Sequence, residues 1–76
     1  MRVAVDANIV LSGLFFQGNE RRLLLAALRG AVTLVLAEDI VEEVYAVVGE
    51  TFRDHAELPA ALDLLAAVLG SGELVP

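Results

Sequence analysis

The chain has 76 residues, of which 58% are apolar, and its 5 basic and 11 acidic residues give a formal charge of −6. It contains no cysteine, which excludes disulfides, thiolate metal sites and cysteine-based catalysis. A chain of this length forms one domain at most and buries only about 60% of the surface that its unfolded form exposes, so we expect some of its apolar surface to contact another chain or a further part of this one.

The net charge and the apolar runs also indicate which binding partners and which cellular location to expect. An excess of acidic residues disfavours binding to nucleic acid unless bound divalent cations or a basic partner chain reverse the charge. No apolar run reaches the roughly 20 residues of a membrane-spanning helix, and Asp6 interrupts the stretch that would form the core of a signal peptide. We therefore expect a soluble, cytoplasmic protein with no membrane partner.

Short apolar runs alternate with helical segments in chain order. The strand-like runs lack polar alternation, as in strands that are covered on both faces. Asn19 and Gly30 are expected to cap one helix, and Pro59 suits the first turn of another. The expected elements are strands over residues 2–6 and 31–36 and from residue 73 on, and helices over residues 8–16, 20–29, 38–49 and 59–69.

The resulting order is βααβααβ, and each connection between strands contains helices. This order predicts an α/β fold with a parallel sheet and helices on its faces. Three strands are few for that architecture, in which roughly five are usual. The chain has no internal repeat, linker or low-complexity segment, so we expect residues 1–76 to form a single domain.

Three polar side chains lie near the end of the first strand. Asp6 ends this strand, and Asn8 and Ser12 follow it in the next helix. No other polar side chain lies between Val3 and Phe16, and isolated polar groups in a buried segment need partners. Ligands of open parallel sheets bind beyond the carboxyl ends of the strands. The pattern indicates either a ligand-binding carboxylate with supporting residues or a turn residue at Asp6 followed by an N-cap at Asn8.

Two neighbouring glutamates of the third helix differ in their position relative to its apolar face. At about 100° per residue, Glu42 falls opposite the apolar arc, whereas Glu43 falls at its edge beside Val47. Asp39 lies four residues before Glu43 on nearly the same line, and a bound cation would relieve the repulsion between them. Glu43 is therefore a candidate ligand or base in a cleft, and the alternative is a solvent-facing acidic edge.

The other polar residues give less specific signals. His55 has no second histidine or cysteine for a metal site, and we interpret it as a surface residue. Arg21 and Arg22 lie at a helix start, where they either contact phosphate or, as we favour, form a solvated face near Glu20. The sequence has no glycine-rich dinucleotide motif and no P-loop. A phosphatase with an aspartate nucleophile is disfavoured because its second aspartate would fall on Asn8.

Two segments match a known pattern in order and spacing. Residues 3–14 read as a strand that ends in aspartate, followed by a small residue, asparagine, an apolar run and serine. Residues 34–44 read as a strand that leads into a helix whose glutamate precedes an apolar residue. These segments resemble the PIN-domain nucleases, specifically the VapC-like toxins of bacterial toxin–antitoxin pairs. By this match the catalytic glutamate of the family falls on Glu43.

The resemblance implies a three-layer α/β/α sandwich and a metal-dependent endoribonuclease. Asp6 and Glu43 would be catalytic and would hold Mg²⁺ or Mn²⁺ through their carboxylate oxygens, while Asn8 and Ser12 would orient Asp6. RNA would be the substrate and an antitoxin protein a partner. The bound cation would also screen the acidic residues that face phosphate.

The length of the chain departs from the family pattern. A PIN domain is considerably longer, and its second half supplies further acidic residues. We therefore expect residues 1–76 to be the N-terminal part of a PIN-like domain and to be inactive without the rest. The alternative is a catalytically inactive truncated module that acts through oligomerisation or by binding a partner.

Two surfaces are expected to mediate association, so we expect a homo-oligomer. The resemblance places the first strand in the middle of the complete sheet, so residues 3–5 would form an exposed edge that pairs with another chain. The helix over residues 59–69 is apolar all round except at Asp63, and such a helix is normally buried. We expect its uncovered face, with Leu62 and Leu65, to lie in a protein contact.

Overall fold

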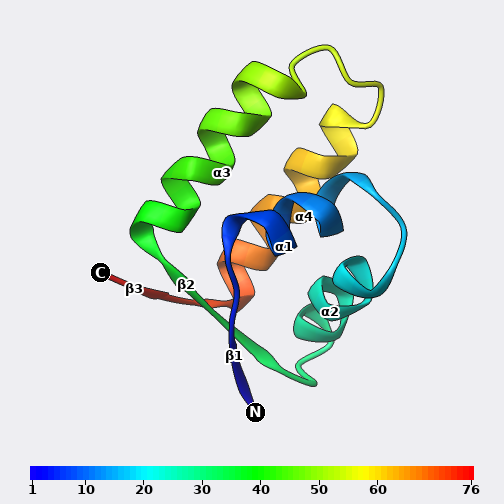
Figure 1. The fold of residues 1–76 in the computed structure, drawn as a ribbon. Coiled ribbons are helices and arrows are strands. Elements are labelled where there is room, and N and C mark those ends of the chain that lie inside the picture. The colour runs from blue at the N-terminus through cyan, green and yellow to red at the C-terminus, as the bar shows by residue number, and fades with distance from the viewer.

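The computed structural model describes residues 1–76 and contains the strands and helices in the expected order (Figure 1). The α/β fold with the order βααβααβ is thus confirmed. No helix combines the length and the hydrophobicity that crossing a membrane requires. The elements are β1 (Arg2–Ala4), α1 (Ala7–Phe15), α2 (Asn19–Leu28), β2 (Thr33–Ala37), α3 (Glu38–Thr51), α4 (Leu58–Ser71) and β3 (Glu73–Val75).

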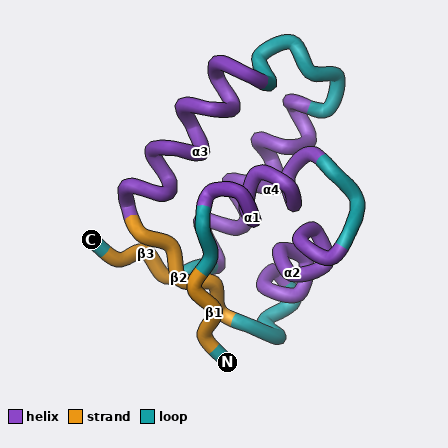
Figure 2. The backbone as a smooth tube through the Cα atoms, in the orientation of Figure 1, coloured by secondary structure: helices purple, strands orange, loops and turns teal.

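The strands form one parallel sheet with β2 in the middle and the helices on one face (Figure 2). Val3 of β1 lies opposite Leu34, and Leu36 lies opposite Leu74 of β3. Both crossovers run in the same direction across the sheet, and because such crossovers are right-handed, their helices lie on the same face. Leu34 and Leu36 are accordingly buried, whereas Val35 between them is only half-buried. The chain itself therefore builds two of the three layers of an α/β/α sandwich.

The core lies between the sheet and the helices and consists of apolar side chains only. Val10 and Leu14 of α1 are fully buried, as are Leu24 of α2 and Val44 of α3. The spacing of four residues between Val10 and Leu14 places both on one face of the helix, as amphipathic packing requires. Neither Asp6 nor any other charged residue is part of this core.

The opposite face of the sheet is not covered by any helix. Ala4 is exposed on it, and Val75 is half-buried. An ion pair between Arg2 and Glu73 crosses β2 on this face, with Arg2 Nε 3.1 Å from Glu73 Oε2. Both side chains are exposed, so the pair adds little stability, but it links the two edge strands. β1 pairs with β2 only, which confirms that the first strand is a free edge in this chain.

Several helix ends differ from the predicted ones. Asn19 is the first residue of α2 rather than its cap, because Gly18 takes the N-cap position. Gly30 follows the end of α2 with φ +81°, the left-handed conformation that favours glycine after a helix. Gly49 and Gly70 lie inside α3 and α4, so each of these helices continues two residues beyond its expected end.

An aromatic cluster holds the turn between α3 and α4 against α1. The rings of Phe15 and Phe52 stack with their centroids 3.9 Å apart, and the ring of His55 meets Phe15 edge-on at 5.2 Å. His55 Nδ1 accepts the backbone N–H of Glu57 at 3.0 Å. His55 is therefore a half-buried member of the cluster. Its prediction as a surface residue is wrong because the turn folds back onto the end of α1.

One face of α4 is buried and another is exposed. Ala61, Leu65 and Val68 are buried, with the i, i+4, i+7 spacing of a single helix face. Leu65 is 1% exposed, whereas Leu62 beside this face is 41% exposed. The expectation that both leucines lie in a contact with another protein is therefore wrong for Leu65, which packs inside its own chain. Leu62 remains accessible for such a contact.

Helices α1 and α2 approach each other closely at Gly13. A Cβ atom on Gly13 would lie 2.5 Å from Leu24 Cδ1 and 3.0 Å from the carbonyl oxygen of Glu20. Leu24 is fully buried, so its side chain can make room for a Cβ atom only by shifting against its neighbours in the core. We therefore expect Gly13→Ala to lower the free energy of unfolding by about 1–3 kcal/mol, the usual cost of overpacking, in urea denaturation followed by circular dichroism.

Gly49→Ala is the matched control for this prediction. Gly49 also lies inside a helix, but a Cβ atom there meets nothing within 4 Å. Alanine should raise the free energy of unfolding by about 0.5–1 kcal/mol, because glycine loses more backbone entropy on folding. Equal effects of Gly13→Ala and Gly49→Ala would contradict the close approach of α1 and α2.

Candidate functional site

Asp6 lies directly beyond β1 and is the N-cap of α1. Its backbone is extended, with φ −99° and ψ 175°, and its Oδ1 accepts the backbone N–H of Ile9 at 2.9 Å. Aspartate commonly satisfies the first N–H groups of a helix in this way. The side chain of Asp6 is exposed, and its Oδ2 makes no hydrogen bond within the chain. Asp6 thus has a capping role and also keeps one oxygen available for a ligand.

Glu43 lies in the second turn of α3, the helix that follows β2 directly. Val44 beside it is buried and Val47 is half-buried, so Glu43 is at the border of the apolar face, as the helical periodicity predicts. Its side chain is exposed and forms no ion pair. β1 and β2 are adjacent parallel strands, so Asp6 and the start of α3 lie at the same end of the sheet. Helices α1 and α3 also pack against each other.

The two residues expected to support Asp6 both lie on α1. Asn8 and Ser12 are four residues apart and therefore lie on one side of the helix. Asn8 is exposed and Ser12 is half-buried, and neither side chain is hydrogen-bonded to Asp6. The N-cap interpretation of Asn8 is wrong, because Asp6 itself is the cap. The contact that orients Asp6 in this structure is the N–H of Ile9.

The donor atoms at this end of the sheet are carboxylate oxygens, which suit Mg²⁺ and Mn²⁺. Nowhere in the chain do three or more His, Cys, Asp or Glu side chains form a group that could hold a metal ion. Asp39, four residues before Glu43, accepts the N–H of Ile40 at 3.0 Å through its Oδ1. Asp6 and Glu43 therefore do not form a complete metal site within this chain, although their carboxylate oxygens are of the kind that Mg²⁺ and Mn²⁺ prefer.

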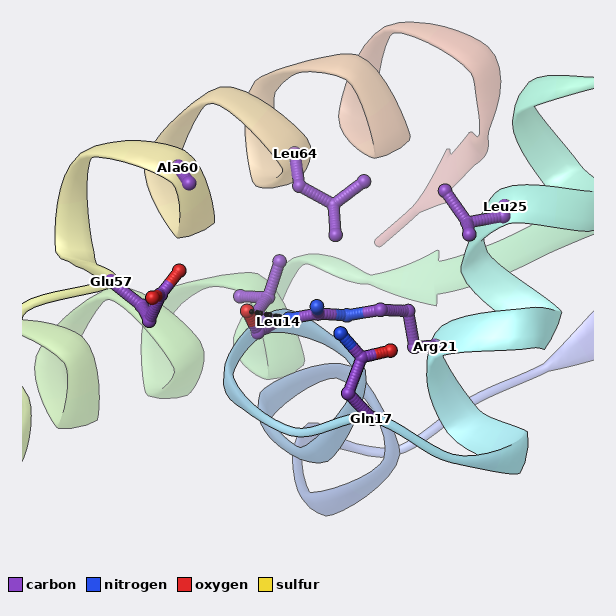
Figure 3. A pocket seen from close by; sticks show the side chains of 7 residues that line it. All are labelled: Leu14, Gln17, Arg21, Leu25, Glu57, Ala60 and Leu64. Atoms are coloured by element: carbon purple, nitrogen blue, oxygen red, sulfur yellow. Dashed lines mark hydrogen bonds between the residues drawn. The ribbon is translucent and has the colours of Figure 1, made fainter.

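The cleft of the molecule lies away from these carboxylates, between the end of α1, α2 and the start of α4 (Figure 3). Its volume is about 350 Å³. Four apolar and three polar residues line it: Leu14, Leu25, Ala60, Leu64, Gln17, Arg21 and Glu57. Neither Asp6 nor Glu43 is among them, so the cleft and the carboxylates are separate features.

Arg21 extends along this cleft and caps the C-terminal end of α1. Its Nε donates to the carbonyl oxygen of Gly13 at 2.9 Å, and its Nη2 donates to that of Leu14 at 2.8 Å. These carbonyls have no partner within the helix, and a cation suits a helix C-terminus. The prediction of a solvated face is wrong for Arg21. No local sequence pattern marks its role, because its acceptors lie on a different helix.

We expect Arg21→Met to lower the free energy of unfolding by about 1–3 kcal/mol, because it leaves two partly buried carbonyls without donors. Arg22→Met is the matched control, since Arg22 is exposed and its side chain makes no hydrogen bond or ion pair. Its effect should stay within about 0.5 kcal/mol. Thermal and urea unfolding measure both variants, and a loss of stability in Arg22→Met as large as that in Arg21→Met would contradict the capping role.

Nearly the whole sequence matches one known protein family. A family model described as PIN domain matches residues 2–73. This chain belongs to the PIN-domain family. No curated protein and no solved structure matches the chain.

Membership of the PIN-domain family supports a nuclease-type function for this chain. PIN nucleases act on RNA or DNA, and PIN domains generally use divalent metal ions. The match includes both Asp6 and Glu43, and the resemblance seen in the sequence is confirmed at the level of the family.

Proposed function

We propose that this PIN-domain chain is the N-terminal part of a metal-dependent endoribonuclease, the toxin of a cytoplasmic toxin–antitoxin pair. One observation carries the proposal: within a PIN-domain match, an exposed aspartate with a free oxygen stands at the carboxyl end of β1. Parallel sheets bind their ligands at that end. The antitoxin would be a protein that binds the chain and blocks access to Asp6.

Asp6 and Glu43 are the residues that would hold Mg²⁺ or Mn²⁺. When bound, the metal lowers the pKa of water and stabilises charge on the scissile phosphate. The N–H of Ile9 restrains Oδ1 of Asp6, so the carboxylate is already oriented before the ligand arrives. Glu43 is a further ligand or the base that accepts the proton of the attacking water. Asn8 and Ser12 are proposed to support Asp6 once the remaining ligands are in place.

The formal charge of −6 affects how strongly this site would bind RNA. Exposed carboxylates repel a phosphate backbone, and neither Asp6 nor Glu43 has a basic partner within the chain. A divalent cation between the carboxylates and the phosphate would remove this repulsion. The same electrostatics make RNA binding by this chain dependent on the metal.

A second function is favoured by the incomplete ligand set. Because the chain has no group of three metal-ligating side chains, it also fits a catalytically inactive module that acts through oligomerisation or by binding a partner. The uncovered face of the sheet and the exposed Leu62 supply surfaces for that role. The two functions differ in whether Glu43 binds metal.

Calorimetric titration of the chain with Mn²⁺, together with an RNA cleavage assay, tests the proposal. We expect weak Mn²⁺ binding that Glu43→Gln removes and Glu42→Gln retains, because Glu42 lies on the solvent side of the same helix. RNA cleavage that EDTA stops and Glu43→Gln abolishes would support the nuclease directly. Absence of both Mn²⁺ binding and cleavage would support the inactive module, and a sub-micromolar Mn²⁺ site would contradict the need for further ligands.

A further inference from the structure

His55 provides two hydrogen-bond acceptors at the start of α4. Its Nδ1 accepts the backbone N–H of Glu57 at 3.0 Å, and its carbonyl oxygen accepts the N–H of Leu58 at 3.1 Å. Glu57 is the N-cap residue of α4, but its side chain forms no cap hydrogen bond. Pro59 in the first turn has no N–H to satisfy. His55 therefore takes the capping role that a side-chain oxygen usually has at a helix N-terminus.

The hydrogen bond at Nδ1 requires the neutral form of the imidazole ring. A neutral ring that accepts at Nδ1 carries its proton on Nε2, whereas both nitrogens of a protonated ring are donors. Edge-on contacts with Phe15 and Phe52 hold the ring in place, with centroids 5.2 and 5.7 Å away. A proton on Nδ1 would face the N–H of Glu57, so protonation breaks this contact.

His55 has no charged partner that would stabilise its protonated form. The charged residues on the elements around the ring are Glu50, Arg53, Asp54, Glu57, Asp63 and Arg21. Helix α1, which the ring packs against, contains no charged residue. His55 forms no ion pair with any of these groups. A cation at this position would also lie at the N-terminus of α4, where the helix dipole disfavours positive charge.

The segment that His55 caps forms one side of the cleft. Glu57, Ala60 and Leu64 line the cleft from the start of α4, and Arg21 and Leu25 line it from α2 (Figure 3). The backbone of the first of these residues is the donor to Nδ1 of the ring. The protonation state of one imidazole is therefore connected to the position of a cleft wall.

We infer that His55 is a pH-sensitive switch for the α4 side of the cleft. The neutral ring holds Glu57 and the first turn of α4 in place, and protonation releases both. Ala61 and Leu65 are buried in the core and keep the rest of the helix packed, so the release is local. The switch does not depend on nuclease activity.

The release falls in a narrow pH range. An imidazole ordinarily changes its charge between about pH 5 and 8, whereas carboxylates do so at about pH 4 and guanidinium groups above about pH 12. Because only the neutral ring accepts the N–H of Glu57, the cleft wall is held above the imidazole range and is released as the pH falls through it. His55 is the only histidine of the chain, so the release belongs to one side chain.

Amide hydrogen exchange measured by NMR tests the switch in the unmodified chain. Relative to the intrinsic rate at the same pH, the N–H of Glu57 should exchange about tenfold faster at about pH 5.5 than at about pH 7.5, the factor that corresponds to one lost hydrogen bond. The ¹⁵N shifts of the ring should place its proton on Nε2 at the higher pH. A proton on Nδ1 there, or equal protection of Glu57 at both pH values, would overturn the proposal.

His55→Asn and His55→Phe separate the hydrogen-bond acceptor from the titration. The Oδ1 of asparagine lies close to the position of Nδ1 and accepts an N–H at any pH, so the protection of Glu57 should stay high at both pH values. Phenylalanine keeps the aromatic contacts but has no acceptor, so the protection should be low at both. A loss of protection on acidification that persists in either variant would contradict the switch, because neither variant contains a histidine.

The methyl signals of two leucines show whether the change is local to the cleft. Leu64 lines the cleft, whereas Leu34 of β2 is fully buried in the core. Lowering the pH should move the Leu64 signals with the same midpoint as the N–H of Glu57 and leave those of Leu34 unchanged. Equal changes at both leucines would indicate unfolding of the whole chain, and unchanged Leu64 signals would show that the cleft does not respond to His55. Either result would overturn the proposal.

Discussion

Asp6→Asn should weaken Mn²⁺ binding by more than about tenfold while the chain stays folded. Removing even an outer partner of a metal ligand typically costs 10–100-fold in affinity, and this variant removes the charge of a proposed ligand. Asparagine caps helices about as well as aspartate does, so the hydrogen bond from the N–H of Ile9 to the side chain is retained. Calorimetry gives the affinity, and urea unfolding gives the stability.

Asp6→Ala is the control that separates the two roles of this residue. Alanine removes both the free oxygen and the cap, so Mn²⁺ binding should fall as in Asp6→Asn, and the free energy of unfolding should also drop by about 0.5–2 kcal/mol. If Asp6→Asn bound Mn²⁺ as the unmodified chain does, Asp6 would be a helix cap and no more.

Leu65→Asp should unfold the chain. Leu65 is 1% exposed in the core between α4 and the sheet, and removing a buried leucine side chain alone costs about 2–5 kcal/mol. An aspartate there would also be a buried charge without a partner, which adds several kcal/mol. A domain of this size has a total stability of about 4–11 kcal/mol. Circular dichroism should therefore show loss of the helical signal at room temperature.

Leu62→Asp is the matched control on the same helix. Leu62 is 41% exposed, so an aspartate there remains solvated, and the variant should fold with a change of about 1 kcal/mol or less. If Leu62 lies in a protein contact, the variant should also have a smaller mass in light scattering than the unmodified chain. Folding of Leu65→Asp would contradict the orientation of α4.

The element order and the parallel sheet could be predicted because they depend on local patterns. The apolar runs that precede Asp6 and Glu38 lack polar alternation, and the helical segments between them separate the strands along the chain. The position of Glu43 at the border of an apolar face follows from the helical repeat alone. The family followed from the spacing of the two segments around Asp6 and Glu43.

Other features depend on contacts between elements that are far apart in the sequence, so no local sequence pattern predicts them. Arg21 bonds to carbonyls of α1, and His55 packs against Phe15 and Phe52, so neither role is visible in the segment that contains the residue. α4 is apolar on nearly all sides, and a helix without a polar stripe does not reveal which face meets the sheet. The burial of Leu65 could therefore be learned only from the fold.

The ion pair between Arg2 and Glu73 joins residues 71 positions apart in the sequence. Contacts of long sequence separation form late in folding, because a large loop must close first. During synthesis α1 and α2 can pack against each other as soon as both have emerged, but Arg2 has no ionic partner until Glu73 of β3 has emerged. Screening by salt weakens the attraction between such exposed charges, so the final closure of the sheet should be slower at high ionic strength. The residue that starts β1 thus acquires its ionic partner only when β3 joins the sheet.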